Sequence, residues 1–176
     1  MNPLKILALA VLSLVVAAVL SIAIYTEYFG PPTDTSEWHR LPSRAQSEVE
    51  RIVPPLNGEK FLYYYSLGAI SFEEDGNLVT DQRVVSYATY EGEPFQFESR
   101  YEDIRDISVQ QGQHFLDDTV ITLHHEDPDL DFELWFSVKR GLDRKIANYI
   151  RQRISQPETE PVEAAQQAIN QPVEQE

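Results

Sequence analysis

The residues with the clearest potential for chemistry form one cluster near the end of the chain's strand-rich part, where two histidines precede several carboxylates. Adjacent residues of a strand point to opposite faces, so His124 and His125 cannot both bind one metal ion from regular β geometry. The segment 127–131 is similar to the start of a calcium-binding loop, but Phe132 stands where glycine is needed and Val138 where a bidentate glutamate belongs. We therefore expect a solvated acidic turn and no metal site.

Nucleophilic catalysis has no support in the sequence. The chain contains no cysteine, and no serine lies in the Gly-x-Ser-x-Gly turn that exposes a catalytic hydroxyl. Carboxylate pairs such as Asp117-Asp118 and Glu73-Glu74 are abundant, but a chain with 29 acidic residues provides such pairs by chance. We expect no catalytic residue and no cofactor, so the protein is not predicted to be an enzyme.

Basic residues gather only towards the end of the strand-rich part, from Lys139 to Arg153. The simpler interpretation is a solvated helix face whose last turn complements the helix dipole. The functional interpretation is a surface for an acidic partner, with Arg144, Lys145 and Arg151 as its candidate residues. Neither interpretation implies nucleic acid, because the formal net charge of −15 repels phosphate backbones.

Three consecutive tyrosines, Tyr63 to Tyr65, offer a second candidate surface. Together with Tyr87, Tyr90 and Trp135 they could line a groove for a peptide. Strand alternation places Tyr63 and Tyr65 on one face and Tyr64 on the other, and at least one of these faces must belong to the core. The sequence does not show which of these aromatic residues line a groove and which belong to the core.

The N-terminal part of the chain predicts a membrane segment. Residues 6–25 contain no charge and no proline, and twenty helical residues span the roughly 30 Å hydrocarbon core of a bilayer. Tyr25 and Tyr28 suit a membrane interface, and the apolar run exceeds the usual length of a signal sequence. We therefore predict an anchor over residues 1–28, although Ser21-Ile22-Ala23 would also serve as the cleavage site of a secretory signal.

The flanking charges predict how this segment is oriented across the membrane. Lys5 precedes it and the first basic residue after it is Arg40, so the N-terminus is expected inside and the large domain on the non-cytoplasmic side. The prediction is a single-pass protein of the cell membrane. Cleavage would instead give a secreted or periplasmic soluble protein.

The remaining elements follow from periodicity and turn chemistry. Residues 29–58 read as a linker with one short helix, which Ser43 and Gln46 would open as a capping box and Pro54-Pro55 would end. Short strands are expected at 61–67, 70–72, 78–80, 84–90, 95–98, 104–109, 119–124 and 132–138, with Asp75-Gly76 as a hairpin turn and 95–98 half-buried. A helix follows with a repeat of four, and an acidic tail over 156–176 is expected to be disordered.

Two local patterns and this order of elements resemble a pleckstrin-homology-like domain of the bacterial type. The first is Leu78-Val79-Thr80-Asp81-Gln82-Arg83-Val84-Val85, a turn between early strands, and the second is Tyr101-Glu102-Asp103-Ile104-Arg105-Asp106-Ile107. The resemblance covers residues 59–155 and implies a mostly β fold, a small barrel of about seven strands capped by a C-terminal helix. It also implies a binding or scaffolding module in a bacterial envelope.

Two structural roles complete the predicted domain. Thr80 and Asp81 can bond the backbone of their own turn, which makes Thr80, Asp81 and Arg83 a structural signature. Leu142, Ile146 and Ile150 would seal an open end of the barrel. The resemblance also brings phosphoinositides as ligands, but the corresponding hairpin, 72–77, is acidic, so we expect a protein partner of unknown identity and the bilayer itself through residues 6–25.

Overall fold

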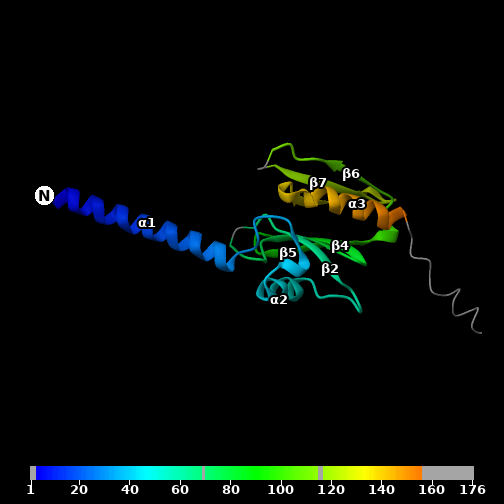
Figure 1. Cartoon of the computed structure of the whole chain (residues 1–176), viewed down its shortest axis with the longest axis horizontal. Coiled ribbons are helices and arrows are strands. Elements are labelled where there is room, and N and C mark those ends of the chain that lie inside the picture. Colours follow the sequence, from blue (N-terminus) through cyan, green and yellow to red (C-terminus); the bar gives the residue numbers. More distant parts are fainter. Residues whose placement is uncertain (1–2, 69, 115–116, 156–176) are drawn as a thin grey trace, which may run out of the picture.

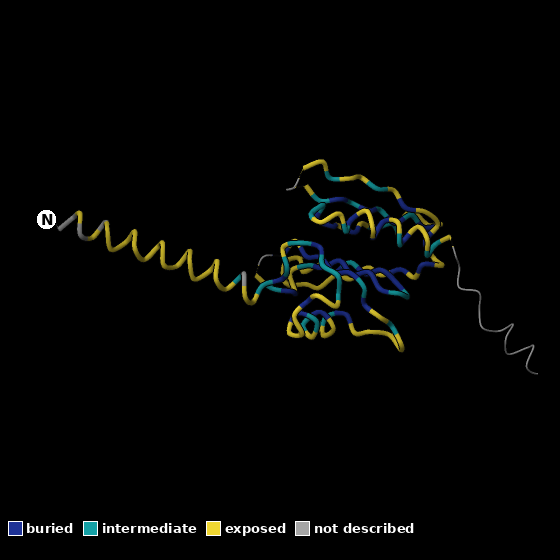
Figure 2. The backbone as a smooth tube through the Cα atoms, viewed as in Figure 1, coloured by how far each residue is buried: buried dark blue, intermediate teal, exposed yellow. Residues whose placement is uncertain are grey.

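The computed structural model describes residues 3–68, 70–114 and 117–155, and the tail predicted to be disordered lies outside them. One long helix projects from a domain built of two sheets and two further helices (Figure 1). The projecting helix, α1 (Pro3–Phe29), is exposed at nearly all of the positions whose burial the structure describes, as Figure 2 shows. Its window Leu9–Thr26 has a mean hydropathy of 2.5 and no part of it is buried, so the helix has the length and composition of a membrane span or of a signal sequence.

The strands form two antiparallel sheets. The five-stranded sheet has the order β1-β2-β3-β4-β5 and the three-stranded sheet the order β6-β7-β8. The first contains β1 (Ser36–Glu37), β2 (Phe61–Tyr65), β3 (Asp75–Thr80), β4 (Arg83–Tyr90) and β5 (Glu93–Arg100). The second contains β6 (Asp106–Gln110), β7 (Asp118–His124) and β8 (Phe132–Ser137). Short 3-10 turns lie between them: η1 (Trp38–Arg40), η2 (Tyr101–Asp103), η3 (Pro128–Leu130) and η4 (Lys139–Gly141).

These elements confirm the predicted fold class, with two differences of detail. Eight strands are present, and the two sheets pack against each other without closing into one hydrogen-bonded barrel among the described residues. Helix α3 (Leu142–Ser155) covers the core between the sheets, and α2 (Ser43–Ile52) covers the opposite face of the five-stranded sheet (Figure 1). The first sheet is therefore buried on both faces at its centre.

The three tyrosines of β2 belong to these two cores. Tyr63 and Tyr65 pack with α3 and the three-stranded sheet, whereas Tyr64 packs with α2. Burial raises the pKa of Tyr64 to about 12, and its hydroxyl lies 3.1 Å from that of Tyr87. The alternation predicted from sequence holds, and the structure makes both faces core rather than groove.

The predicted strand at 70–72 and the predicted turn at Asp75-Gly76 are wrong. Residues 70–74 form a turn, and Asp75 and Gly76 begin β3. The Asp75 carboxylate accepts hydrogen bonds from the Leu67 amide and the Ser66 hydroxyl, which fixes the loop between β2 and β3. Glycine stands at position 76 because a Cβ there would lie 2.3 Å from the ring of Tyr87, not because the chain turns.

The predicted capping box of α2 is also wrong. Pro42 occupies the N-cap position, and no side chain caps the helix there. Ser43 is the first residue of the helix, and the Gln46 side chain donates instead to the carbonyl oxygen of Trp38 at 2.8 Å. Proline has no N–H, so one donor fewer needs an acceptor at the start of the helix. The hydrogen bond from Gln46 fastens α2 to η1.

Burial of α3 should account for much of the domain's stability. Ile146 and Ile150 are fully buried in the core, and Leu142 is partly buried against it. We expect Ile146→Ala to lower the free energy of unfolding by about 3 kcal/mol, because it leaves a cavity among close-packed groups. Urea unfolding of the full chain in detergent, followed by tryptophan fluorescence, measures this. The matched control is Gln152→Ala on the exposed side of the same helix, and equal loss in both variants would contradict the assignment.

Candidate functional site

Thr80 closes the turn between β3 and β4. Its hydroxyl oxygen accepts from the amides of Gln82 and Arg83 at 3.0 and 2.9 Å, and the hydroxyl donates to the Arg83 carbonyl oxygen at 2.9 Å. The Tyr101 hydroxyl donates to the Thr80 carbonyl oxygen at 2.6 Å. The Asp81 carboxylate accepts from the Lys60 amide at 2.8 Å. These groups are engaged with backbone, and in this structure they hold strands together.

Arg83 extends from this turn into the protein. Its guanidinium is only 6% exposed and donates to Glu59 at 2.9 Å, to the Pro54 carbonyl oxygen at 2.9 Å and to Glu98. Burial alone raises the pKa of Glu59, but the hydrogen bonds from Arg83 and from the Leu56 amide favour its charged form, and the pKa lies below its ordinary value. The buried cation therefore joins the linker to β4 and β5.

The three basic residues proposed as a partner surface do not form one cluster. Lys145 lies 2.8 Å from Glu37 of β1 and over the ring of Tyr63, and the hydrogen bond to Glu37 raises the pKa of its ammonium. Arg144 and Arg151 are exposed and line a shallow depression beside Asp143. The structure thus brings two of the three together and assigns the third to the linker.

The two histidines lie on either side of Asp131. His124 is 2.8 Å from one carboxylate oxygen and 3.0 Å from the Ser108 hydroxyl, whereas His125 is buried and 2.8 Å from the Ser99 hydroxyl. The hydrogen bond with His124 lowers the pKa of Asp131. No group of three metal-ligating side chains occurs in the described parts of the chain. The acidic turn is a 3-10 turn in which Asp127 accepts from the amide of Asp129.

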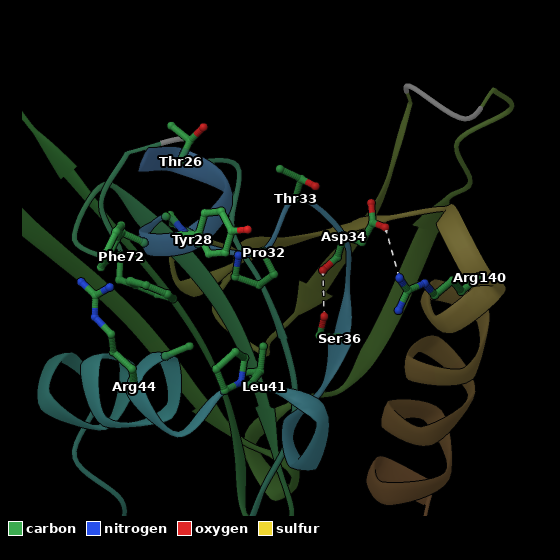
Figure 3. Close-up of a pocket in the computed structure, with 15 residues that line it drawn as sticks. Thr26, Tyr28, Pro32, Thr33, Asp34, Ser36, Leu41, Arg44, Phe72 and Arg140 are labelled. Carbon is green, nitrogen blue, oxygen red and sulfur yellow. Dashed lines mark hydrogen bonds and ion pairs between the residues drawn. The ribbon is translucent and has the colours of Figure 1, made fainter. Parts of the chain in front are cut away.

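A first depression lies where α1 meets the domain. This pocket, here called the α1 pocket, has a volume of about 480 Å³, and its walls come from the end of α1, residues 30–36, the start of α2, Phe72 and Arg140 (Figure 3). Asp34 lies 2.6 Å from the Lys139 ammonium and 3.7 Å from the Arg140 guanidinium. Arg44 lies over the ring of Phe29 at 4.6 Å. The ion pairs thus join Asp34 to η4, and the contact between Arg44 and Phe29 joins α2 to the end of α1.

A second depression, here called the acidic groove, lies at the other end of the domain. Its volume is about 720 Å³, and it runs between the C-terminal half of β5, η2 and the connection from β7 to β8. One cation, Arg105, lines it. Six carboxylates also line it: Glu98, Glu102, Asp103, Glu126, Asp127 and Asp129. Of these, Glu98 is paired with Arg83 and Glu102 lies 3.7 Å from Arg100, while the connection 126–130 is exposed throughout.

The floor of the acidic groove is aromatic. Phe97 stacks on Phe132 with ring centroids 5.9 Å apart, and His125 stacks on the other side of Phe132 at 6.0 Å. The His125 ring is 6% exposed, and its Nδ1 has no hydrogen-bond partner although its Nε2 bonds Ser99. Phe97 itself remains 55% exposed. The groove therefore joins an apolar platform to a negatively charged rim.

The sequence did not predict this groove, and its burial prediction for β5 is wrong. The strand exists, but Phe95 and Phe97 are both exposed, although Phe97 stacks on Phe132 of the three-stranded sheet. The alternation of apolar and polar residues indicated a covered face. A weak signal was the acidic run after His125, which the sequence assigned to a simple turn.

No family model matches the chain, and no curated protein matches it. Two solved structures are similar. A DUF1696 family protein with a pleckstrin-homology domain from Shewanella loihica PV-4 has 14% identity and a TM-score of 0.49, with 70% of this chain and 99% of that chain covered. A pleckstrin-homology domain from Shewanella amazonensis SB2B has 16% identity and a TM-score of 0.43, with 64% of this chain and 96% of that chain covered. Both are described by the name of the domain that the sequence resembles.

The pairing of Glu59 with Arg83 gives a pH-dependent prediction. The lowered pKa of Glu59 means that its contribution to stability is complete above pH 4.5 and is lost as the pH falls through the folded-state pKa. We expect Glu59→Gln to lower the free energy of unfolding by about 3 kcal/mol at pH 7, since it leaves a buried cation short of one partner. The difference from the unmodified protein should shrink below pH 4.5.

Denaturant unfolding at a series of pH values checks this difference. Glu50→Gln is the matched control, because it removes the same charge from an exposed position of α2. A Glu59→Gln variant as stable as the Glu50→Gln variant at pH 7 would show that the buried pair does not hold the linker to the sheet.

Proposed function

We propose that the protein is a membrane-anchored, non-catalytic interaction module, which binds a protein partner at the bacterial envelope with its domain on the non-cytoplasmic side. The observation that carries this proposal is α1, a helix of 27 residues whose apolar window Leu9–Thr26 is not buried by any part of the domain. Such a length corresponds to about 40 Å, which is sufficient to cross a bilayer. Ser13 and Ser21, its polar side chains within the apolar run, donate to backbone carbonyl oxygens one turn earlier.

The anchor is joined to the domain by a fastened linker. The Thr35 hydroxyl donates to the Ser137 carbonyl oxygen at the end of β8, and Asp34 contacts Lys139 at the start of η4. Ser36 and Glu37 pair with β2. A linker held at both sheets restricts the domain to a small volume beside the bilayer, which raises its effective concentration near other membrane proteins, so modest affinity suffices.

Support for binding over catalysis comes from the form of the two depressions. Both are open to solvent, and in the α1 pocket Asp34 pairs with Lys139 and Arg140. The acidic groove offers an exposed aromatic platform and carboxylates, groups that recognise a partner by shape and charge. A protein partner suits this surface better than an anionic lipid head group, which the carboxylates repel.

The alternative is a secreted or periplasmic binding protein released by cleavage. It is favoured by one observation, the small-residue site Ser21-Ile22-Ala23 inside α1. Cleavage after Ala23 would leave Tyr25 and Phe29, whose rings stack 5.4 Å apart, on a soluble domain. The two hypotheses predict different mature N-termini.

Membrane extraction and N-terminal sequencing test the anchor. We expect the mature chain to retain residues 1–23 and to stay in the membrane through alkaline carbonate extraction. Leu14→Asp combined with Ala18→Asp should release it, because charged groups at the bilayer centre are unfavourable. Leu14→Val combined with Ala18→Leu is the matched apolar control. A mature chain that starts at Ile24 would overturn the anchor.

The absence of cysteine allows a direct test of orientation. A single Glu50→Cys variant places a thiol on the exposed side of α2, and a single Asn2→Cys variant places one before the membrane segment. We expect a membrane-impermeant maleimide to label the Glu50→Cys variant in intact spheroplasts and the Asn2→Cys variant only after lysis. The reverse pattern would place the domain in the cytoplasm.

A further inference from the structure

The outer edge of β5 is free. The strand ends the five-stranded sheet, and among the described residues its backbone pairs only with β4. Its hairpin has a two-residue turn in which Glu91 and Gly92 both adopt positive φ, so Tyr90 and Glu93 form the hydrogen-bonded pair nearest the turn. Counting from that pair, every second residue of β5 directs its amide and carbonyl outwards.

The outward-facing backbone groups belong to residues 94, 96, 98 and 100. Pro94 has no amide hydrogen, so the end of the strand near the turn cannot donate to an added strand. Gln96 and Glu98 remain as amide and carbonyl pairs with the correct spacing for another strand. Both residues also line the acidic groove, so the free edge and the depression coincide.

We infer that the acidic groove binds an extended basic peptide segment of the partner protein, which adds as a strand to the free edge of β5. The inference rests on the proposed function and names the chemistry of its partner. Main-chain hydrogen bonds to Gln96 and Glu98 supply affinity in such an arrangement, and pockets beside the strand supply specificity.

Charge selects a basic peptide. Carboxylates from three separate segments converge on the groove, and Asp103, Glu126 and Asp129 are exposed without a cation within ion-pair distance in the described residues. Lysine or arginine side chains of a peptide would lie against them and relieve their mutual repulsion. An acidic or neutral segment would leave that repulsion in place.

The platform selects an apolar residue between the basic ones. Successive side chains of an added strand alternate between the two faces, and the face towards the three-stranded sheet meets the exposed ring of Phe97 and the exposed Leu130. We therefore expect a peptide that alternates basic and apolar residues.

The position of the groove suits a partner that approaches from outside the membrane. The groove includes η2, and the ring of Tyr101 in η2 packs against Arg153 in the last turns of α3. The α1 pocket lies at the other end of the domain, where Asp34 contacts Lys139 and Arg140, just before α3 begins. α3 runs away from α1 (Figure 1), so η2 and the groove lie at the end of the domain remote from α1 and, in the proposed arrangement, from the bilayer.

The test uses the full chain in nanodiscs of zwitterionic phosphatidylcholine, with empty nanodiscs as the blank. The probe is a fluorescent heptapeptide, Lys-Val-Lys-Leu-Lys-Val-Lys, and its partner probe has every lysine replaced by glutamate. Fluorescence anisotropy should show binding of the lysine peptide and none of the glutamate peptide. Affinity should fall steeply as salt increases, because the contact is electrostatic at the rim.

Two sets of variants separate edge pairing from charge. Gln96→Pro removes an outward amide without breaking the ladder to β4 and should reduce affinity at least tenfold, whereas Gln96→Ala should retain it. Asp103→Asn with Glu126→Gln and Asp129→Asn should weaken binding about tenfold at low salt. Glu48→Gln with Glu50→Gln and Glu133→Gln, which removes the same charge elsewhere, should bind as the unmodified chain does.

Several outcomes would overturn the inference. Equal binding of the lysine and glutamate peptides would contradict selection of a basic peptide. Equal affinity of the Gln96→Pro and Gln96→Ala variants would contradict strand addition at β5. Association of the chain with itself that Gln96→Pro abolishes would make a second copy the occupant. Partner crosslinking to the domain that persists in the Gln96→Pro variant would leave the proposed function standing and place the partner on another surface.

Discussion

The buried guanidinium of Arg83 is the constraint on which the rest of the domain depends. A cation removed from water is unfavourable unless its donors all find acceptors, and here they meet Glu59, Glu98 and the carbonyl oxygen of Pro54. These acceptors belong to the linker and to β5, two parts that contribute little apolar surface to each other. The ion pairs therefore fix the direction in which the linker enters the sheet, and they hold β5 from its inner side while its outer edge stays free.

The two-faced burial of the first sheet follows from that arrangement. Once the linker is fastened at Glu59 and Pro54, α2 lies against the face that carries Tyr64, and α3 closes the face that carries Tyr63. β2 to β4 are buried between these layers, and β5 extends beyond both. A sheet wider than its covering layers must expose apolar side chains at its edge, which accounts for Phe95 and Phe97.

The sequence predicts the elements that depend on local patterns. It misses the features that depend on how the sheets and helices pack against one another. The apolar run of α1, the period of α3 and the bonds of Thr80 all lie within short windows, so composition and spacing indicate them. The acidic groove joins Glu98, Asp103 and Glu126, which are separated by a turn, two strands and their connection. Nothing local shows that these carboxylates converge. The same limit explains β5, where alternation indicates two faces but not whether a second layer covers one of them, and Gly76, whose role depends on a ring in the next strand.

The net charge of the domain affects how the acidic groove would lie relative to a bilayer. The domain is strongly acidic, and the anionic head groups of a bilayer repel such a surface, so an anchored domain of this charge is favoured away from the lipid. The basic residues nearest α1, among them Arg44, Lys139 and Arg140, contact Phe29 or Asp34, so in the proposed anchored arrangement they reduce that repulsion only at the end of the domain next to α1. A groove at the far end then faces solvent without competition from lipid. In that proposed arrangement, electrostatic repulsion favours an orientation in which the acidic groove and the free edge of β5 face away from the lipid.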